Sequence, residues 1–376
     1  MWARALPMKS KRDLLIRALG AVFILALSLI YSVPALRSGT ARVAQSLYSA
    51  AGVKGEFFSV DHVDATTVFL VGDAGDMTES VLASLRAAVR ATPSSKALLY
   101  LGDNVYPNGI PTDTSTHAWE AARRNLLRQI EPLRAFTDKI YFIPGNHDWE
   151  NHSEDGWNAA KRETRFIDDA LGSGHSLPPN GCPGPVRVEL VSGLQLVALD
   201  SSWWLHEHRK PSNSSDGCET FSPEGVLSSL DAMLASTPAG TETIIALHHP
   251  IIEPKADVAH PDCPTGPTCP SYIDMRDRLS AILAKHQPLL CASGHNHVLQ
   301  VLRDQAGCRN YVVSGAASTT YQAPQELTAS FSESALGFMV LSQRGKEPWM
   351  LDVIKTSRDD SLMPYSSRSV FHSIIQ

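Results

Sequence analysis

The stretch Ala97-Leu-Leu-Tyr-Leu-Gly-Asp-Asn-Val-Tyr106 decides the fold, because an apolar run of strand length ends abruptly at glycine and aspartate. Continuously apolar runs of this length, bounded by turn residues, are typical of strands buried on both faces. The same pattern recurs at residues 67–73, 140–146, 196–200, 243–248, 288–294 and 311–315. We therefore expect a sheet-based protein with polar residues at the strand ends.

Stretches with helical periodicity separate several of these runs, at residues 78–91, 117–135, 222–236 and 272–285. An alternation of strands and helices predicts a layered α/β architecture. Two later apolar runs, at 338–342 and 349–354, are expected to close a second sheet.

The N-terminus has a different character. Residues 1–17 contain five basic side chains, and residues 18–36 contain no charged side chain. A basic region followed by an apolar segment is a membrane-targeting element, and its length approaches the ~20 residues that span a bilayer. The long basic region favours an uncleaved anchor, with the rest of the chain outside the cytoplasm. A cleaved signal peptide is the alternative, and would give a secreted or periplasmic protein.

This organisation implies a tether at residues 37–64, a catalytic domain at 65–355 and a polar, loosely held tail at 356–376. All six cysteines follow the membrane segment, on the side expected to be oxidising, which favours disulfides. Cys263 and Cys269 bracket a loop rich in proline and glycine and are predicted to pair, whereas the other pairings stay open. The net charge is −6, whereas nucleic-acid-binding proteins usually carry an excess of basic residues.

Five polar clusters stand at the ends of predicted strands. They are Gly72-Asp-Ala-Gly-Asp76, Gly102-Asp-Asn-Val-Tyr106, Gly145-Asn-His-Asp148, His248-His-Pro250 and Gly294-His-Asn-His297. Ligands of α/β proteins bind outside the carboxyl ends of the strands, so these clusters should converge. Imidazole and carboxylate groups together bind Zn, Fe or Mn, and two such ions about 3.5–4 Å apart can clamp a phosphate and activate water. The sequence predicts a dimetal phosphoesterase centre.

In residue type and order, these clusters resemble those of the calcineurin-like metallophosphoesterase superfamily, over about residues 66–316. They are most similar to the purple acid phosphatases of the tartrate-resistant type, because Gly75 replaces the usual histidine and Tyr106 lies three residues after Asp103. The resemblance implies a four-layer α/β sandwich, with two mixed β-sheets flanked by helices, after the N-terminal membrane segment. It also implies hydrolysis of phosphomonoesters through attack by metal-bound water or hydroxide.

The resemblance further implies two metal ions, Fe(III) and a divalent Fe, Zn or Mn, bridged by Asp103. The other ligands of the ferric ion would be Asp73, Tyr106 and His297. The other ligands of the divalent ion would be Asn146, His248 and His295. If Tyr106 is instead an aromatic residue that packs on its loop, the first site would be less selective for iron.

His147 is implied to protonate the leaving group or to stabilise the phosphate oxygens. Asp148 either orients that imidazole or caps the turn. Asn104, His249 and His260 are further candidates for contact with the substrate.

Two other functions stay open. The same fold could hydrolyse a phosphodiester, a nucleotide or a lipid phosphate. A membrane-tethered, non-catalytic binding protein is the other alternative, which the complete set of ligand positions argues against. The expected partners are a small phosphoester and, through residues 18–36, a membrane, with no nucleic acid; the sequence predicts no oligomeric state.

Overall fold

The structure is a computed structural model that describes residues 58, 60, 65–93, 95–252, 269–303, 307–323, 329–358 and 365–376. The predicted membrane segment, nearly all of the predicted tether, Cys263 and His260 lie outside these residues. Among the described residues, no helix combines the length and the apolar character that crossing a membrane requires.

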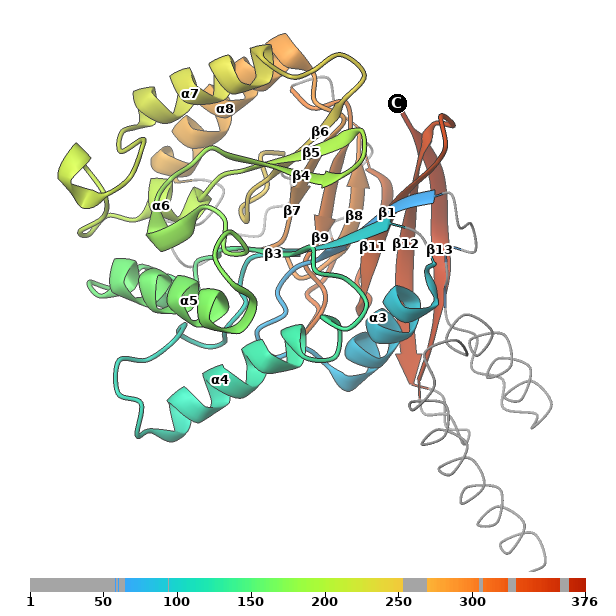
Figure 1. Ribbon diagram of the computed structural model, residues 1–376, viewed down its shortest axis with the longest axis horizontal. Helices are drawn as coiled ribbons and strands as arrows, with labels where there is room; N and C mark the ends of the chain where they lie inside the picture. Colours follow the sequence, from blue (N-terminus) through green and yellow to red (C-terminus); the bar gives the residue numbers. More distant parts are fainter. Residues whose placement is uncertain are drawn as a thin grey trace, which may run out of the picture. The chain divides into compact units, whose positions relative to one another are not determined.

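Two mixed sheets form the centre of the fold (Figure 1). The first has the strand order β13-β12-β11-β1-β2-β3. Its strands are β1 (Ala65–Val71), β2 (Ser95–Leu101), β3 (Ile140–Ile143), β11 (Gly337–Arg344), β12 (Trp349–Arg358) and β13 (Tyr365–Ile375). Strands β1, β2 and β3 run parallel, and β11, β12 and β13 extend the sheet in antiparallel fashion.

The second sheet has the order β10-β8-β9-β7-β6-β5-β4. Its strands are β4 (Val186–Val191), β5 (Leu194–Ala198), β6 (Glu242–Ala246), β7 (Leu290–Ser293), β8 (Leu299–Leu302), β9 (Tyr311–Ser314) and β10 (Ala329–Glu333). Strands β5, β6, β7 and β9 run parallel to one another. Each sheet therefore contributes parallel strands whose carboxyl ends can carry a site.

Helices cover the outer face of each sheet (Figure 1). They are α3 (Glu79–Ala91), α4 (His117–Ile130), α5 (Gly156–Leu171), α6 (Ser201–Leu205), α7 (Pro223–Ala235) and α8 (Pro270–His286). Helices α3 and α4 bury their apolar faces on the first sheet, and α7 and α8 on the second. Between the sheets lies a third core, with Val68 and Leu99 from one sheet and Leu196 and Leu290 from the other. This arrangement confirms the predicted α/β fold of two mixed sheets flanked by helices.

The predicted loose tail at residues 356–376 is wrong. Strand β12 continues to Arg358, and β13 pairs with it from Trp349↔Ile375 to Arg358↔Tyr365. Strand β13 is an edge strand, and its polar side chains alternate with partly buried ones such as Phe371, so its sequence is polar enough to resemble a tail.

Helix α5 was also not predicted. Its buried positions include small or polar residues such as Ala159, Ala160, Glu163 and Thr164. Few of the side chains that it buries are large and apolar, so its sequence offers few apolar positions from which to recognise a helix. Helix α5 nevertheless matters for the site, because it follows directly on the cluster after β3.

Two disulfides link parts of the second sheet and its surrounding loops. They join Cys182 to Cys218 and Cys291 to Cys308. Cys269 is also disulfide-bonded, and the described residues contain no free cysteine. The predicted pairing of Cys269 with Cys263 stays a prediction, because Cys263 lies outside the described residues.

Replacing Cys182 and Cys218 together by serine should lower the free energy of unfolding by about 2–5 kcal/mol, because the bond restricts the unfolded chain. The bond spans 36 residues. Urea denaturation under non-reducing conditions measures the change. Equal unfolding midpoints for the variant and the parent protein would contradict a stabilising disulfide at this position.

Candidate metal centre

The five predicted clusters follow the carboxyl ends of β1, β2, β3, β6 and β7, and backbone hydrogen bonds hold these ends together. The Gly72 amide donates to the Ser314 carbonyl (2.7 Å) and the Asp73 amide to the Gly102 carbonyl (3.0 Å). The Gly294 amide donates to the His248 carbonyl (3.1 Å). Motifs from both sheets thus meet at one place.

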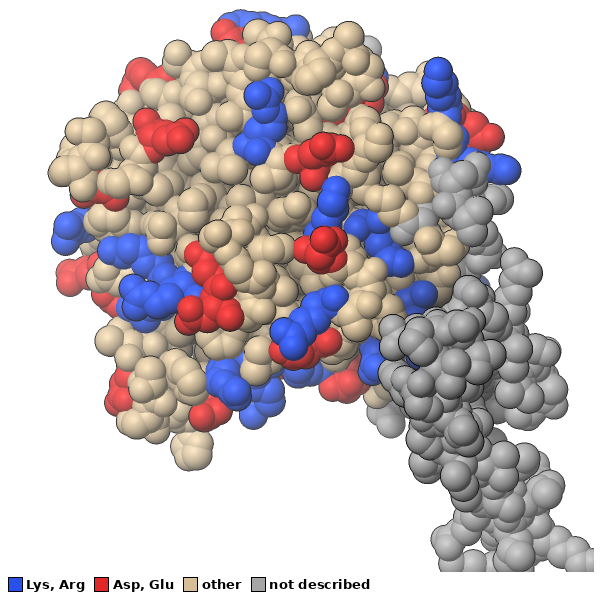
Figure 2. Space-filling model, viewed as in Figure 1, with Lys and Arg blue, Asp and Glu red and all other residues tan. Residues whose placement is uncertain are grey.

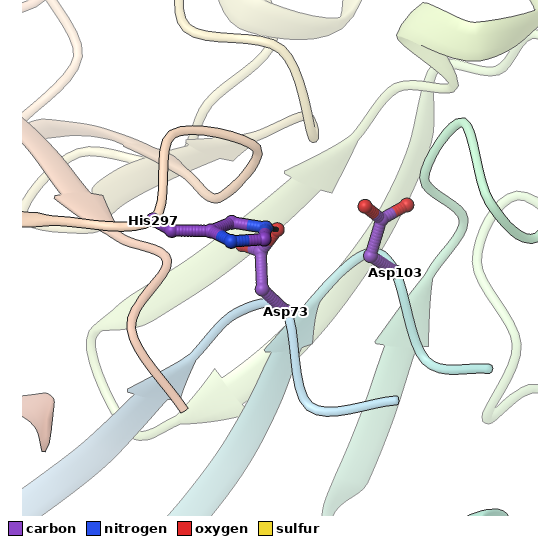
Figure 3. A group of neighbouring side chains, drawn as sticks. All are labelled: Asp73, Asp103 and His297. Atoms are coloured by element: carbon purple, nitrogen blue, oxygen red, sulfur yellow. Dashed lines mark ion pairs between the residues drawn. The ribbon is translucent and has the colours of Figure 1, made fainter. Parts of the chain in front are cut away.

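One group of side chains surrounds the hydroxyl of Tyr106. That hydroxyl lies 3.1 Å from Asp73 Oδ1, 3.3 Å from Asp103 Oδ2 and 3.0 Å from His297 Nε2. Asp73, Asp103 and His297 each offer one ligand atom within 4.8 Å of the others, and all three are buried (Figure 3). These residues form a candidate metal site.

A second group surrounds the amide oxygen of Asn146. Asn146 Oδ1 lies 3.1 Å from His248 Nε2 and 3.0 Å from His295 Nδ1. His248 Nε2 is also 3.3 Å from Asp103 Oδ1. Asp103 therefore presents one oxygen to each group, which is the geometry that a bridging carboxylate needs.

The charges and hydrogen bonds around His248 favour a cation in the second group. His248 Nδ1 faces the Leu101 carbonyl at 2.8 Å, so this nitrogen carries the proton of a neutral ring. Nε2 faces two oxygens, Asn146 Oδ1 and Asp103 Oδ1, so it is the nitrogen that holds either the second proton of a charged ring or a metal ion. Burial by itself would lower the pKa of His248, but the Asp103 charge outweighs burial and raises the pKa to about 9. A proton and a metal ion compete for this nitrogen, and the negative charge of Asp103 that holds the proton also favours a bound cation.

The first group also attracts positive charge. Burial raises the pKa of Tyr106 well above its usual value, and the charges of Asp73 and Asp103 raise it further. Without a cation, this phenol therefore stays protonated, and its hydroxyl donates hydrogen bonds to the carboxylates. Burial would raise the pKa of Asp103, but the charges of His248 and His147 and their hydrogen bonds to it hold the pKa well below its usual range.

The backbone around the centre adopts conformations that few side chains tolerate. Asp73, Asp103 and His295 have φ angles of 57°, 54° and 67°. Gly102 has a φ of 88°, and a Cβ atom there would collide with the His248 ring. Left-handed conformations of non-glycine residues are costly and cluster at functional sites.

His147 borders the centre at the surface and is partly exposed. Its backbone amide donates to Asp103 Oδ1 at 2.9 Å. Its ring Nδ1 contacts the Pro107 carbonyl, while Nε2 lies 3.9 Å from Asp103 Oδ2. The imidazole thus presents Nε2 to the space beside the bridging carboxylate.

The proposal that Asp148 orients His147 is wrong in this structure. The Asp148 carboxylate instead accepts hydrogen bonds from the backbone amides of Gly145 (2.8 Å), Asn104 (2.9 Å) and Val105 (3.0 Å). It therefore fixes the loops after β2 and β3, as the alternative turn-capping interpretation expected.

The Asn104 side chain, a predicted substrate contact, instead points into the protein. Its side chain is fully buried and donates to the Ile143 carbonyl (2.8 Å) and to Glu163 Oε1 (2.9 Å). Burial raises the pKa of Glu163 well above its usual value, and Asp148 raises it further by charge and by a hydrogen bond. Glu163 therefore stays protonated, and its carboxyl group shares a hydrogen bond with Asp148. No sequence signal marks Glu163, because helix α5 itself was not predicted.

The remaining substrate candidates differ in their outcome. His249 is fully buried, its Nδ1 lies 2.8 Å from Ser201 Oγ, and its ring centroid is 4.3 Å from that of His295. Its position favours support of His295 over contact with a substrate. His260 lies outside the described residues.

Two neighbours of the centre were missed. The ring of Tyr321 stacks on His297 with a centroid distance of 4.4 Å, and 53% of this residue is exposed. Asn151 Oδ1 lies 3.3 Å from Asn146 Nδ2. No sequence pattern marks Tyr321, whereas the position of Asn151 close after the third cluster was a usable signal.

Comparison with known families agrees with this geometry. The family model described as calcineurin-like phosphoesterase matches residues 66–299, more than half of the chain. The chain belongs to this family. Calcineurin-like phosphoesterases are metal-dependent hydrolases that bind two metal ions, and the two side-chain groups around Asp103 provide a candidate site for them. Among curated proteins, none matches the chain by sequence.

Solved structures share the fold of this calcineurin-like phosphoesterase at low identity. GAP50, the anchor in the inner membrane complex of Plasmodium, is 14% identical with a TM-score of 0.54, over 83% of this chain and 88% of that one. Purple acid phosphatase PPD1 from yellow lupin (Lupinus luteus) seeds is 13% identical with a TM-score of 0.52, over 82% of this chain and 54% of that one. PhoD is 11% identical with a TM-score of 0.53, over 82% and 69%.

Replacing Glu163 by alanine should destabilise the fold by about 1–3 kcal/mol, because Asn104 and Asp148 lose a buried hydrogen-bonding partner. Glu163→Gln is the matched control, since it keeps a donor for Asp148 and an acceptor for Asn104. Thermal unfolding at pH 5 measures both variants. A glutamine variant as unstable as the alanine variant would contradict this pairing.

The raised pKa of Glu163 also predicts a pH dependence. The folded state holds this proton more tightly than the unfolded state, so the stabilisation is complete below about pH 4.3 and decreases as the pH rises. Glu163→Gln lacks this titration and should lose less stability between pH 5 and pH 8. Parallel losses in both proteins would contradict the assignment.

Proposed function

We propose that this metal-dependent phosphoesterase hydrolyses phosphomonoesters at an Fe(III)–M(II) centre, in the manner of an acid phosphatase. The observation that carries the proposal is the Tyr106 hydroxyl, which lies within 3.3 Å of Asp73, Asp103 and His297. A phenol placed among carboxylates and an imidazole supports a hard, trivalent ion at this position. All three of these contacts of the hydroxyl are with polar groups.

In this proposal, Asp103 would contribute a ligand to each of the two ions. Asp73, Tyr106 and His297 would complete the ferric site, and Asn146, His248 and His295 would hold the divalent Fe, Zn or Mn. When bound, such a pair supplies Lewis acidity toward the phosphate and an activated nucleophile at neutral pH.

The chain's own groups perform the remaining steps. The carboxylates and imidazoles of the two groups would hold the two ions and thereby fix the place where a phosphate can bind. His147 stands at the exposed edge of the centre, where its Nε2 can bind a phosphate oxygen or deliver a proton to the departing alcohol. The contact between its Nδ1 and the Pro107 carbonyl holds the ring in this orientation.

Tyr106→Phe tests the ferric site directly. The iron-loaded parent protein should show a visible tyrosinate-to-iron band, and the variant should lose it, because phenylalanine offers no oxygen ligand. Visible spectra with metal analysis provide the measurement. A band of unchanged intensity in the variant would assign the colour to another residue and remove the observation that carries the proposal.

Asp103→Ala and His295→Ala test the dimetal reaction. Each should lower kcat/KM for an aryl phosphomonoester by at least ~100-fold, since removal of a group that acts in the transition state costs several kcal/mol. Parallel assays with an aryl phosphodiester separate the substrate classes. Full activity of either variant would exclude the centre, whereas equal or faster diester turnover by the parent protein would favour the phosphodiesterase alternative.

A non-catalytic role is the second candidate. This candidate comes from the similarity in fold to GAP50, an anchor protein. An identity of 14% shows a shared fold and not a shared function. The convergence of the predicted ligands favours the enzyme. A parent protein that retains no metal after reconstitution, and no hydrolase activity, would favour the anchor.

The proposal places the catalytic domain outside the cytoplasm, tethered through residues 18–36 or released by cleavage. Two disulfides among the described residues support an oxidising compartment. We expect no nucleic-acid partner. On the face shown in Figure 2, basic and acidic side chains are interspersed, which supports this expectation.

A further inference from the structure

Asn151 lies in the short helix η2 (Glu150–His152), directly beyond the third cluster. Its side chain makes contacts at both ends. Asn151 Oδ1 lies 3.3 Å from Asn146 Nδ2, and Asn151 Nδ2 donates to the Pro107 carbonyl (3.0 Å) and to Asn108 Oδ1 (2.7 Å). One carboxamide thus connects the loop after β2 to Asn146.

The Pro107 carbonyl fixes the direction of this chain of contacts. A backbone carbonyl can only accept, so the NH2 group of Asn151 must face it. Asn151 Oδ1 then points to Asn146 and accepts from its NH2 group. Reversing either amide would place two donors or two acceptors against each other. The side-chain oxygen of Asn146 therefore faces His248 Nε2 and His295 Nδ1.

The backbone of this turn favours asparagine. Glu150, Asn151 and His152 have consecutive φ angles of 53°, 51° and 60°, and the Asn151 amide donates to the Asn146 carbonyl at 2.9 Å. Asparagine is among the residues that best tolerate the left-handed region. Its short side chain can therefore turn back onto Asn146 from a backbone conformation that would be strained for most other residues.

We infer that Asn151 is a positioning residue that locks the Asn146 amide with its oxygen toward the divalent metal site. The inference rests on the proposed function, in which Asn146 is a metal ligand. An amide binds a metal ion through its oxygen, so a freely rotating Asn146 would spend part of its time with the NH2 group toward the ion. The same Pro107 carbonyl contacts the His147 ring, so one loop positions both neighbouring groups.

Asn151→Gly isolates the side chain, because glycine keeps the left-handed backbone without strain. In the full-length protein reconstituted with Fe(III), we expect the Zn²⁺ affinity, measured by chelator competition, to fall about 10- to 100-fold, the usual effect of removing a group that orients a ligand. The visible band of the ferric site should stay unchanged. Glu150→Gly is the matched control in the same turn, with a φ of 53° but no contact to Asn146, and should stay within about twofold of the parent protein.

A double-mutant cycle separates orientation from general damage to the turn. In an Asn146→Asp background both carboxylate oxygens are equivalent, so no amide needs orienting. Asn151→Gly should then lower Zn²⁺ affinity by less than about threefold, or raise it, because Asn151 Oδ1 faces a carboxylate oxygen without a proton in this background. This non-additivity is the signature of the proposed role. A merely structural effect of Asn151→Gly would instead persist in that background at full size, which would overturn the inference.

The remaining outcomes are also distinct. If the parent protein binds Zn²⁺ and Asn151→Gly binds it equally well, the inference fails while the proposed function stands. If the parent protein reconstituted with Fe(III) binds none of Zn²⁺, Mn²⁺ and Fe²⁺, the proposed function fails and the inference fails with it.

Discussion

The buried carboxylate of Asp103 is the group on which the rest of the site depends. It is 1% exposed, yet its two oxygens face Tyr106 on one side and His248 on the other. A buried charge costs free energy unless hydrogen bonds or opposite charges compensate it. Here the compensation comes from the His147 amide and from the His248 ring, and a bridging position between two cations would complete it.

This requirement explains why the surrounding backbone is tightly constrained. Asp103 can approach His248 only because Gly102 has no side chain at a point where a Cβ atom would collide with that ring. Asp103 itself accepts a left-handed conformation, at a cost in free energy that the hydrogen bonds around the strand ends offset. Asp148 and the protonated Glu163 form a second layer behind the site, which holds the loops after β2 and β3 together.

Much of this protein could be predicted from the sequence because its parallel strands are buried on both faces. Such strands are continuous apolar runs, and the five clusters stand where those runs end. The edge strand β13 escaped prediction because its sequence is largely polar, and helix α5 because few of the side chains that it buries are large and apolar. The roles of Asn104 and Asp148 were misjudged for a different reason, since adjacency to a ligand in sequence does not fix the direction of a side chain.

The sequence by itself determined the residue types of the site, the strand ends that carry them and the family of the chain. Only the tertiary structure decided which neighbours face the centre and which face the core. Asn104 follows Asp103 directly but turns inward to Glu163, whereas Asn151, from a separate turn, reaches Asn146. The physical reason is that hydrogen bonds between residues far apart in the chain set these directions, with fixed acceptors such as the carbonyls of Leu101 and Pro107 at their ends.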